Sequence, residues 1–175
     1  MRIIAGRYGS RIIKAPRGFT THPMGDRIKS SLFNSLGDLS GKTVWDAFSG
    51  SGALAIESAS RGAQHVVATE RDPKAYKVVK DNVEKMGARN IEVIKATCKS
   101  WASTNVEKEF DIIFCDPPYN DLQLSTVFAL KSHLKPNGLM VLSYPGRQEV
   151  PTANGVVVVD NRNYGDAALA FYRLG

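Results

Sequence analysis

The sequence predicts an α/β protein built on a mostly parallel sheet with helices on both faces. From Gly41 onward, short apolar segments alternate with amphipathic segments, as in chains that wind strand, helix and strand. A glycine-rich turn follows the first apolar segment, where Rossmann-like folds begin a helix. Two strand-like segments end the chain with no helix between them, which is typical of an antiparallel hairpin at one edge of the sheet.

Seven strands are expected, with helices in three of the connections. Asp72 followed by Pro73 is a typical helix start, and Gly62 and Gly87 stand where helices typically end. We expect the parallel strands in the order 3-2-1-4-5 along the sheet, with one antiparallel edge strand. The predicted strands are 43–48, 65–69, 91–94, 110–115, 139–143, 156–160 and 167–172, and the predicted helices are 51–61, 73–86 and 122–134.

Basic residues are concentrated at the N-terminus. The chain has a formal net charge of +6, and its first 29 residues hold seven basic side chains and one acid, whereas the remainder is neutral. A basic segment on a neutral body favours a polyanionic partner, most often nucleic acid, over a solvated tail without a partner. The residues expected to contact phosphates are Arg2, Arg7, Arg11, Lys14, Arg27 and Lys29.

The basic segment is predicted to fold. Residues 2–5 and 11–14 mix charged and apolar side chains and indicate a β-hairpin, with Tyr8 near its tip, where it can stack on a base or ribose. Residues 15–25 are expected to form an irregular connector, and Asp26 to cap a helix over 27–36. We therefore expect a nucleic-acid-binding extension at 1–40 and the main domain at 41–175.

Composition places the chain among ordinary globular proteins. Hydrophobic residues make up 43% and charged residues 23% of its 175 positions. No apolar run approaches the ~18 residues of a membrane-spanning helix, and the N-terminus lacks the pattern of a signal peptide. Cys98 and Cys115 lack metal-ligand spacing, so we expect no metal and a cytoplasmic location.

The turn after the first strand has the features of a nucleotide-cofactor site. Gly50 and Gly52 allow a tight turn and a close approach of the backbone to a ligand. Asp46 stands near the strand end, where a carboxylate can accept a hydrogen bond from an ammonium group or an ordered water. Glu70 ends the second strand, and a carboxylate at that position binds ribose hydroxyls. Together these residues predict a site for an adenosine-containing cofactor.

Two cofactors compete for this site. Residues 50–55 fit the loose pattern G-x-G-x-x-G/A, which also occurs in NAD-binding proteins. Asp46, however, favours a cationic amino acid over a pyrophosphate, and the chain is too short to add the substrate domain of a typical dehydrogenase. S-adenosylmethionine, with its sulfonium and α-ammonium groups, therefore fits better than NAD. Phe48 and Arg71, which are close to these residues in sequence, complete the predicted contacts on this side.

A second candidate site follows the apolar segment 110–115. Asp116, Pro117, Pro118 and Tyr119 form a rigid loop that offers a carboxylate, a carbonyl and an aromatic face. These groups suit a planar base that bears an exocyclic amine. In the expected strand order this loop and the glycine turn flank one crevice. The arrangement predicts methylation of an exocyclic amine, with Asp116, Pro117 and Tyr119 as the catalytic residues.

These residues also carry a family resemblance. Asp-Pro-Pro-Tyr at 116–119 resembles the Asp/Asn-Pro-Pro-aromatic motif of amino-methyltransferases that act on nucleic-acid bases. Nearly the whole chain resembles the RsmD-type methyltransferases of small-subunit (16S) ribosomal RNA, which make N2-methylguanine. The matching segments are 2–6, 26–29 with 32–34, 48–54 with Glu57, 60–63, 116–119 and Tyr164-Gly165-Asp166.

The resemblance implies a class I methyltransferase fold and methyl transfer from S-adenosylmethionine to guanine N2, at a site of the guanine-966 type. It implies small-subunit ribosomal RNA or a 30S assembly intermediate as the partner, and we expect a monomer without membrane contact. Two other interpretations stay open. A DNA or RNA adenine-N6 methyltransferase would share the Asp-Pro-Pro-Tyr motif, and a non-catalytic RNA-binding assembly factor could use the same scaffold.

Two departures from the family pattern concern the details of the site. The family usually has Arg-Pro-Thr-x-Asp-Arg-Val-Arg-Glu where residues 22–30 read His-Pro-Met-Gly-Asp-Arg-Ile-Lys-Ser. Lys29 thus keeps a positive charge but lacks the guanidinium fork. After the third strand the family tends to place Asp or Asn for the cofactor's adenine amine. Thr97 would have to serve that role here through its hydroxyl.

Overall fold

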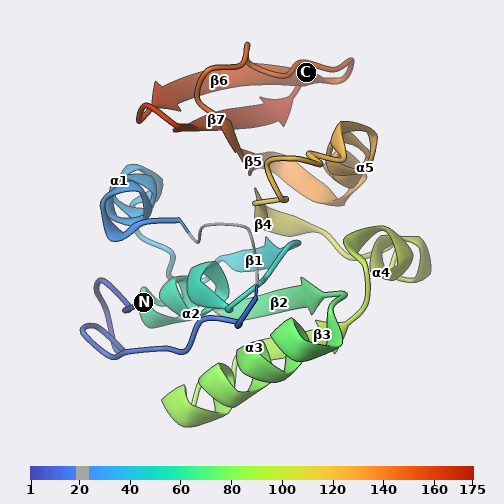
Figure 1. Cartoon of the computed structure of the whole chain (residues 1–175). Helices are drawn as coiled ribbons and strands as arrows, with labels where there is room; N and C mark the ends of the chain where they lie inside the picture. The colour runs from blue at the N-terminus through green and yellow to red at the C-terminus, as the bar shows by residue number, and fades with distance from the viewer. Residues whose placement is uncertain (19–23) are drawn as a thin grey trace.

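A seven-stranded sheet in the order β3-β2-β1-β4-β5-β7-β6 organises the computed structural model, which describes residues 1–18 and 24–175 (Figure 1). Five neighbouring strands, β3, β2, β1, β4 and β5, are parallel and lie in the predicted order. Strand β7 is antiparallel to both β5 and β6. The terminal hairpin is therefore confirmed, with the antiparallel strand second from the edge. The strands are β1 Thr43–Asp46, β2 His65–Glu70, β3 Ile91–Lys95, β4 Phe110–Cys115, β5 Leu134–Pro145, β6 Val156–Asn163 and β7 Ala167–Leu174.

Helices cover both faces of this sheet, and the described residues contain no helix long and apolar enough to cross a membrane. Helix α3 begins and ends as predicted, because Asp72 Oδ1 accepts hydrogen bonds from the amides of Lys74 and Ala75 and Gly87 adopts a left-handed conformation. The helices are α1 Asp26–Leu36, α2 Ala53–Ser60, α3 Pro73–Met86, α4 Cys98–Thr104 and α5 Leu124–Ala129, followed by the 3-10 helix η1 Leu130–His133.

Two elements differ from the prediction. Helix α4 was not expected, because its seven residues are too few to show helical periodicity. The single helix expected at 122–134 is instead the short α5 followed by η1, and β5 begins at Leu134. The pairing of β5 with β4 shifts register between Phe110 and Ile112. Strand β5 therefore continues through Pro-Asn-Gly at 136–138, the sequence that was expected to separate the helix from the strand.

Alternating strand residues divide the core between the two faces. On one face Val44, Val66 and Phe114 pack against α1, α2, α3 and the N-terminal segment. On the other face Trp45 and Ile113 pack against α4, α5 and η1. The strands β1, β2 and β4 are thus buried on both sides, which explains their continuous apolar segments in the sequence.

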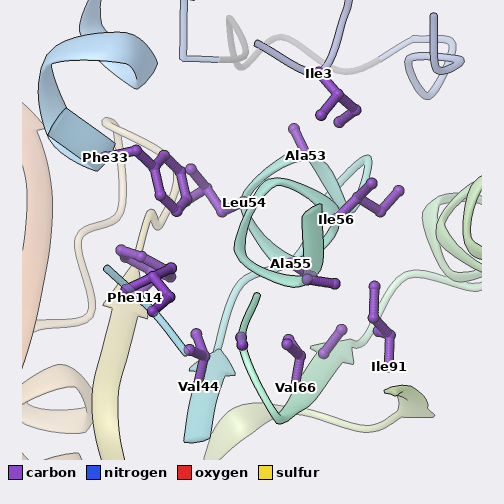
Figure 2. Packing of buried hydrophobic residues seen from close by; sticks show 14 of the residues in the cluster. Ile3, Phe33, Val44, Ala53, Leu54, Ala55, Ile56, Val66, Ile91 and Phe114 are labelled. Atoms are coloured by element: carbon purple, nitrogen blue, oxygen red, sulfur yellow. The ribbon is translucent and has the colours of Figure 1, made fainter. Parts of the chain in front are cut away.

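The N-terminal segment, residues 1–18, packs on α2. Figure 2 shows Ile3 lying over α2 near Ala53 and Ile56, while Phe33 of α1 faces Phe114 of β4. The predicted hairpin is reduced to one isolated antiparallel bridge between Arg2 and Ile12. Residues 19–23, the middle of the predicted connector and part of the departure at 22–30, lie outside the described residues.

Two expectations about this segment were wrong. Tyr8 is 5% exposed and belongs to the core, so its ring is not available for stacking on a base. Asp26 lies in the first turn of α1 and does not cap it; the N-cap is Gly25, and the Asp26 carboxylate instead accepts a hydrogen bond from Arg2 Nε at 3.1 Å. Both residues hold the N-terminal segment in place.

Candidate active site

A cavity of about 870 Å³ lies where the parallel strands end. It collects residues from the ends of all five parallel strands, as expected for a doubly wound sheet. The loop after β4 faces the turns after β1, β2 and β3 across this space. The predicted site residues among its lining are Phe48, Gly50, Glu70, Arg71, Thr97, Asp116, Pro117 and Tyr119.

The pairing of β1 with β4 brings the two halves of the site together. Asp46 lies opposite Phe114 in the parallel register, and the amide of Ala47 donates to the carbonyl of Phe114 at 3.0 Å. The chain then leaves β1 toward the glycine turn and β4 toward Asp116. Two segments 70 residues apart in sequence therefore border one cavity.

Gly50 and Glu70 form the rim on the β1 and β2 side. Gly50 has φ +58°, a conformation that favours glycine, and apart from its chain neighbours no atom of the described residues lies within 4 Å of the position a Cβ would take. Its amide donates to Glu70 Oε2 at 2.8 Å, and the amide of Asp72 donates to Glu70 Oε1 at 2.8 Å. A carboxylate has about four acceptor positions, so Glu70 is fixed in place and still has capacity for two hydroxyl groups.

Asp46 lies behind the cavity wall and not on it. Its side chain is fully buried, and Oδ2 accepts hydrogen bonds from Ser49 Oγ at 3.0 Å and the amide of Ala55 at 3.2 Å. Oδ1 has no partner among the described residues. Burial, assisted by the nearby charge of Asp116, raises the pKa of Asp46 to about 7. An unpaired, buried acceptor beside the cavity suits a ligand that brings positive charge.

Gly52 and Thr97 have local roles as well. Gly52 begins α2 with φ +81°, and an added Cβ would lie 3.0 Å from Val79 Cγ1 of α3, so this glycine permits close helix packing outside the cavity lining. Thr97 lines the cavity and caps α4, where its hydroxyl accepts from the amide of Ser100 at 3.0 Å. The predicted cofactor residues thus include two, Asp46 and Gly52, that act from behind the lining.

The loop after β4 presents the acceptor side. Burial raises the pKa of Asp116 to about 6, partly offset by the hydroxyl of Ser143. Among the described residues, no hydrogen bond reaches the carbonyl of Pro117. Tyr119 is 38% exposed and lines the cavity, and its hydroxyl lies 2.8 Å from Ser143 Oγ. A carboxylate, a free carbonyl and an aromatic face therefore lie together.

Ser143 is the site residue that sequence reasoning missed. It lies in β5, is 4% exposed and lines the cavity beside Tyr119. Like Asp116 after the neighbouring strand, Ser143 stands near the end of an apolar strand. This position in the sequence could have indicated that Ser143 belongs to the site. An apolar wall was also missed; it consists of Met1 and Pro16 of the N-terminal segment, Met24 just before α1, and Ile28 of α1.

The basic residues expected to bind phosphates separate into two groups. Arg7, Arg11, Lys14 and Arg27 are exposed, as is Arg2, which pairs with Asp26. Lys29 corrects the prediction: its side chain is 1% exposed, and Nζ donates to the carbonyl of Arg2. Burial lowers its pKa, so Lys29 stabilises the N-terminal segment and is not available to a partner. None of the six residues lines the cavity.

Comparisons with known proteins agree with this geometry. Residues 1–173 match the family model described as "Conserved hypothetical protein 95". The chain is 33% identical to the "Putative rRNA methyltransferase YlbH" of Bacillus subtilis, covering 99% of this chain and 98% of that protein. It is 27% identical to the "Ribosomal RNA small subunit methyltransferase D" of Haemophilus influenzae, with coverage of 99% and 93%. The structure of "Putative methyltransferase yhhF" from Escherichia coli superposes with a TM-score of 0.83 at 25% identity, with coverage of 99% and 97%.

Proposed function

The chain belongs to the RsmD-type methyltransferase family, and from that membership and the cavity we propose that it methylates the exocyclic N2 amine of a guanine in small-subunit ribosomal RNA, using S-adenosylmethionine. One observation carries the proposal. The loop at residues 116–119 suits the acceptor base, and the rim formed by Gly50 and Glu70 suits the cofactor. Both line the same cavity. We take ribosomal RNA as the substrate class because relatives that match most of this chain are named ribosomal RNA methyltransferases.

The residues of the rim fit the proposed cofactor. Glu70 is held by two backbone amides in a position to accept from ribose hydroxyls, and the open face of Gly50 permits close approach. The unpaired Oδ1 of buried Asp46 would supply negative potential to the α-ammonium group. Thr97 and Arg71 line the cavity beside this rim and would contact the adenine. When bound, S-adenosylmethionine would supply an electrophilic methyl group on a positively charged sulfur and leave as the neutral thioether S-adenosylhomocysteine.

The residues after β4 act on the acceptor. A guanine N2 amine is a weak nucleophile, because its lone pair is delocalised into the ring. Hydrogen bonds from its two N–H groups to the Asp116 carboxylate and the Pro117 carbonyl favour a pyramidal nitrogen and stabilise positive charge as it develops. The ring of Tyr119 stacks on the base and contributes about 1–3 kcal/mol to holding it. Much of the rate comes from holding two reactants in line.

The proposal is tested by mass spectrometry of nucleosides from ribosomal RNA of cells with and without this protein. We expect N2-methylguanine to decrease when the protein is absent and to be restored by the wild-type chain. A change in N6-methyladenine instead would support the adenine alternative. No change in any methylated nucleoside would contradict enzymatic function and leave the assembly-factor interpretation.

Asp116→Ala tests the chemistry separately. We expect methyl transfer to fall by about 100-fold or more, because the variant lacks a group that stabilises the developing charge. S-adenosylmethionine should still bind, as measured by calorimetry, since the rim residues are untouched. Near-normal transfer by Asp116→Ala would contradict the assigned role of this carboxylate even if the nucleoside experiment succeeds.

A further inference from the structure

A second cavity lies at the opposite end of the sheet from the active site. It has a volume of about 770 Å³ and is bordered by the tip of the N-terminal segment, the end of α2 and the turn between α3 and β3. Figure 1 shows the tip of the dark-blue N-terminal segment near the end of α3, away from the strand arrowheads. Since β2 has six residues at about 3.3 Å each, the two cavities are roughly 20 Å apart.

Three arginines gather at this cavity without acidic partners. Arg7 and Arg89 line it. The guanidinium groups of Arg7 and Arg11 both lie over the ring of Tyr8, with their central carbons 5.7 and 5.6 Å, respectively, from the ring centre. None of the three forms an ion pair with another described residue. By contrast Arg61, also at the end of α2, pairs with Glu57 at 2.8 Å. The positive charge of the three arginines is therefore not neutralised within the described part of the chain.

The backbone that carries Arg7 is held rigidly. The amide of Arg7 donates to the carbonyl of Ser60 at 2.8 Å, and the amide of Tyr8 donates to Ser60 Oγ at 2.8 Å. Gly6 lies so close to α2 that an added Cβ would be 2.0 Å from the carbonyl oxygen of Ser60. The guanidinium groups of Arg7 and Arg11 thus project from a fixed base against a buried ring, which lowers the entropic cost of binding a ligand.

We propose that this cavity is a second RNA contact, in which Arg7 and Arg89 bind backbone phosphates of a segment distant from the target base. Guanidinium groups match phosphate oxygens in pairs. Asn90 borders the same cavity, and its side-chain amide has a second N–H beyond the one donated to the carbonyl of Ala63. The inference rests on the proposed function and deepens it. A substrate that contacts both cavities must extend over roughly 20 Å along the sheet.

The test measures binding of a folded small-subunit rRNA fragment as a function of salt concentration. We expect Arg7→Gln/Arg89→Gln to bind more weakly than wild type. The slope of log affinity against log salt should decrease by about one for each phosphate that the variant no longer binds. Arg89→Glu should weaken binding further, because it adds repulsion. Unchanged affinity for S-adenosylmethionine, measured by calorimetry, shows that both variants are folded.

A matched control removes two positive charges elsewhere. Lys108→Gln/Arg173→Gln changes exposed residues outside both cavities and should retain most of the wild-type affinity and slope. If the two double variants have equal affinities and slopes, the second contact does not exist and only net charge matters. If the wild-type protein methylates ribosomal RNA in that case, the proposed function stands without the second contact. Absence of methylation by wild type would contradict the proposed function itself.

Discussion

Asp46 and Asp116 are two buried carboxylates at adjacent strand ends, and their ionisation links stability to ligand binding. Burial raises their pKa values to about 7 and about 6 from an ordinary value of 3.8. Between pH 4 and these values the folded protein keeps protons that the unfolded chain releases. The contribution of the two groups to stability is therefore fully present below about pH 4 and is lost as pH rises from there through 6 and 7.

We predict that the ligand-free protein has a higher melting temperature at pH 5.5 than at pH 8, and that S-adenosylmethionine binds more tightly at pH 8. Its positive charge favours the ionised carboxylates, so binding near pH 6.5 should release protons. Calorimetry in buffers of different ionisation enthalpy measures this release. The control is Asp46→Asn, in which the pH dependence should shrink. An equal proton release by wild type and Asp46→Asn would contradict the assignment.

Ser143 is expected to position both catalytic side chains. Its hydroxyl lies 2.8 Å from the hydroxyl of Tyr119. The same hydroxyl lowers the pKa of Asp116 and so partly offsets the increase caused by burial. We predict that Ser143→Ala reduces kcat/KM for RNA by about fivefold, the value of one hydrogen bond of about 1 kcal/mol. It should also move the acidic limb of the pH profile to higher pH, because Asp116 becomes harder to ionise.

Tyr119→Phe is the matched control for Ser143→Ala, since it removes the same hydrogen bond from the other side. It should reduce kcat/KM by a similar factor while leaving Ser143 beside Asp116, so the acidic limb should stay in place. If the two variants show the same pH profile, Ser143 acts only through Tyr119. A Ser143→Ala variant with wild-type kinetics would show that the contact has no role in the reaction.

The N-terminal segment is the element in which glycine matters most. Gly6 has φ +80° and lies against the carbonyl of Ser60, whereas Gly18 has φ +78° and, apart from its chain neighbours, none of the described residues lies within 4 Å of the position its Cβ would take. We predict that Gly6→Ala destabilises the protein by about 2 kcal/mol or more in urea unfolding, since it adds a clash to the backbone strain. Gly18→Ala should cost only about 1 kcal/mol, from strain alone. Equal costs would show that the segment can move away from α2 without penalty.

Helix α3 connects this segment to the cofactor rim through one side chain. Asn82 is 1% exposed, and its amide group accepts from the amide of Lys14 and donates to the carbonyls of Lys14 and Ser51 at 2.8–2.9 Å. All three hydrogen bonds join elements that are distant in sequence. The position of the basic segment is therefore tied to that of the glycine turn.

At the scale of the whole molecule, the N-terminal segment joins the two ends of the sheet. Its tip borders the cavity with Arg7 and Arg89, while Met1, Ala15 and Pro16 line the active site. Its apolar residues Ile3, Tyr8 and Ile13 belong to the same core cluster as α2. The division into an extension at 1–40 and a main domain at 41–175 stays a prediction, although both parts contribute to one core.

Local chemistry determined much of this protein from its sequence. Alternating segments predicted the parallel sheet, Asp72 and Gly87 the limits of α3, and the residues after the first, second and fourth apolar segments a common crevice. These predictions succeed because each depends on neighbours in sequence or on the regular geometry of a wound sheet. The glycines, Glu70 and the Asp-Pro-Pro-Tyr loop could be recognised for the same reason.

Burial of polar side chains was decided only by the tertiary structure. Lys29 and Tyr8 look like surface residues in sequence, yet both are covered once the N-terminal segment packs against α1 and α2. Ser143 becomes a site residue only because β5 pairs with β4. The cavity with Arg7 and Arg89 exists only because the turn after α3 places Arg89 next to the tip of the N-terminal segment. Sequence periodicity identifies faces of single elements, whereas long-range packing decides which face meets a neighbour and which meets a ligand.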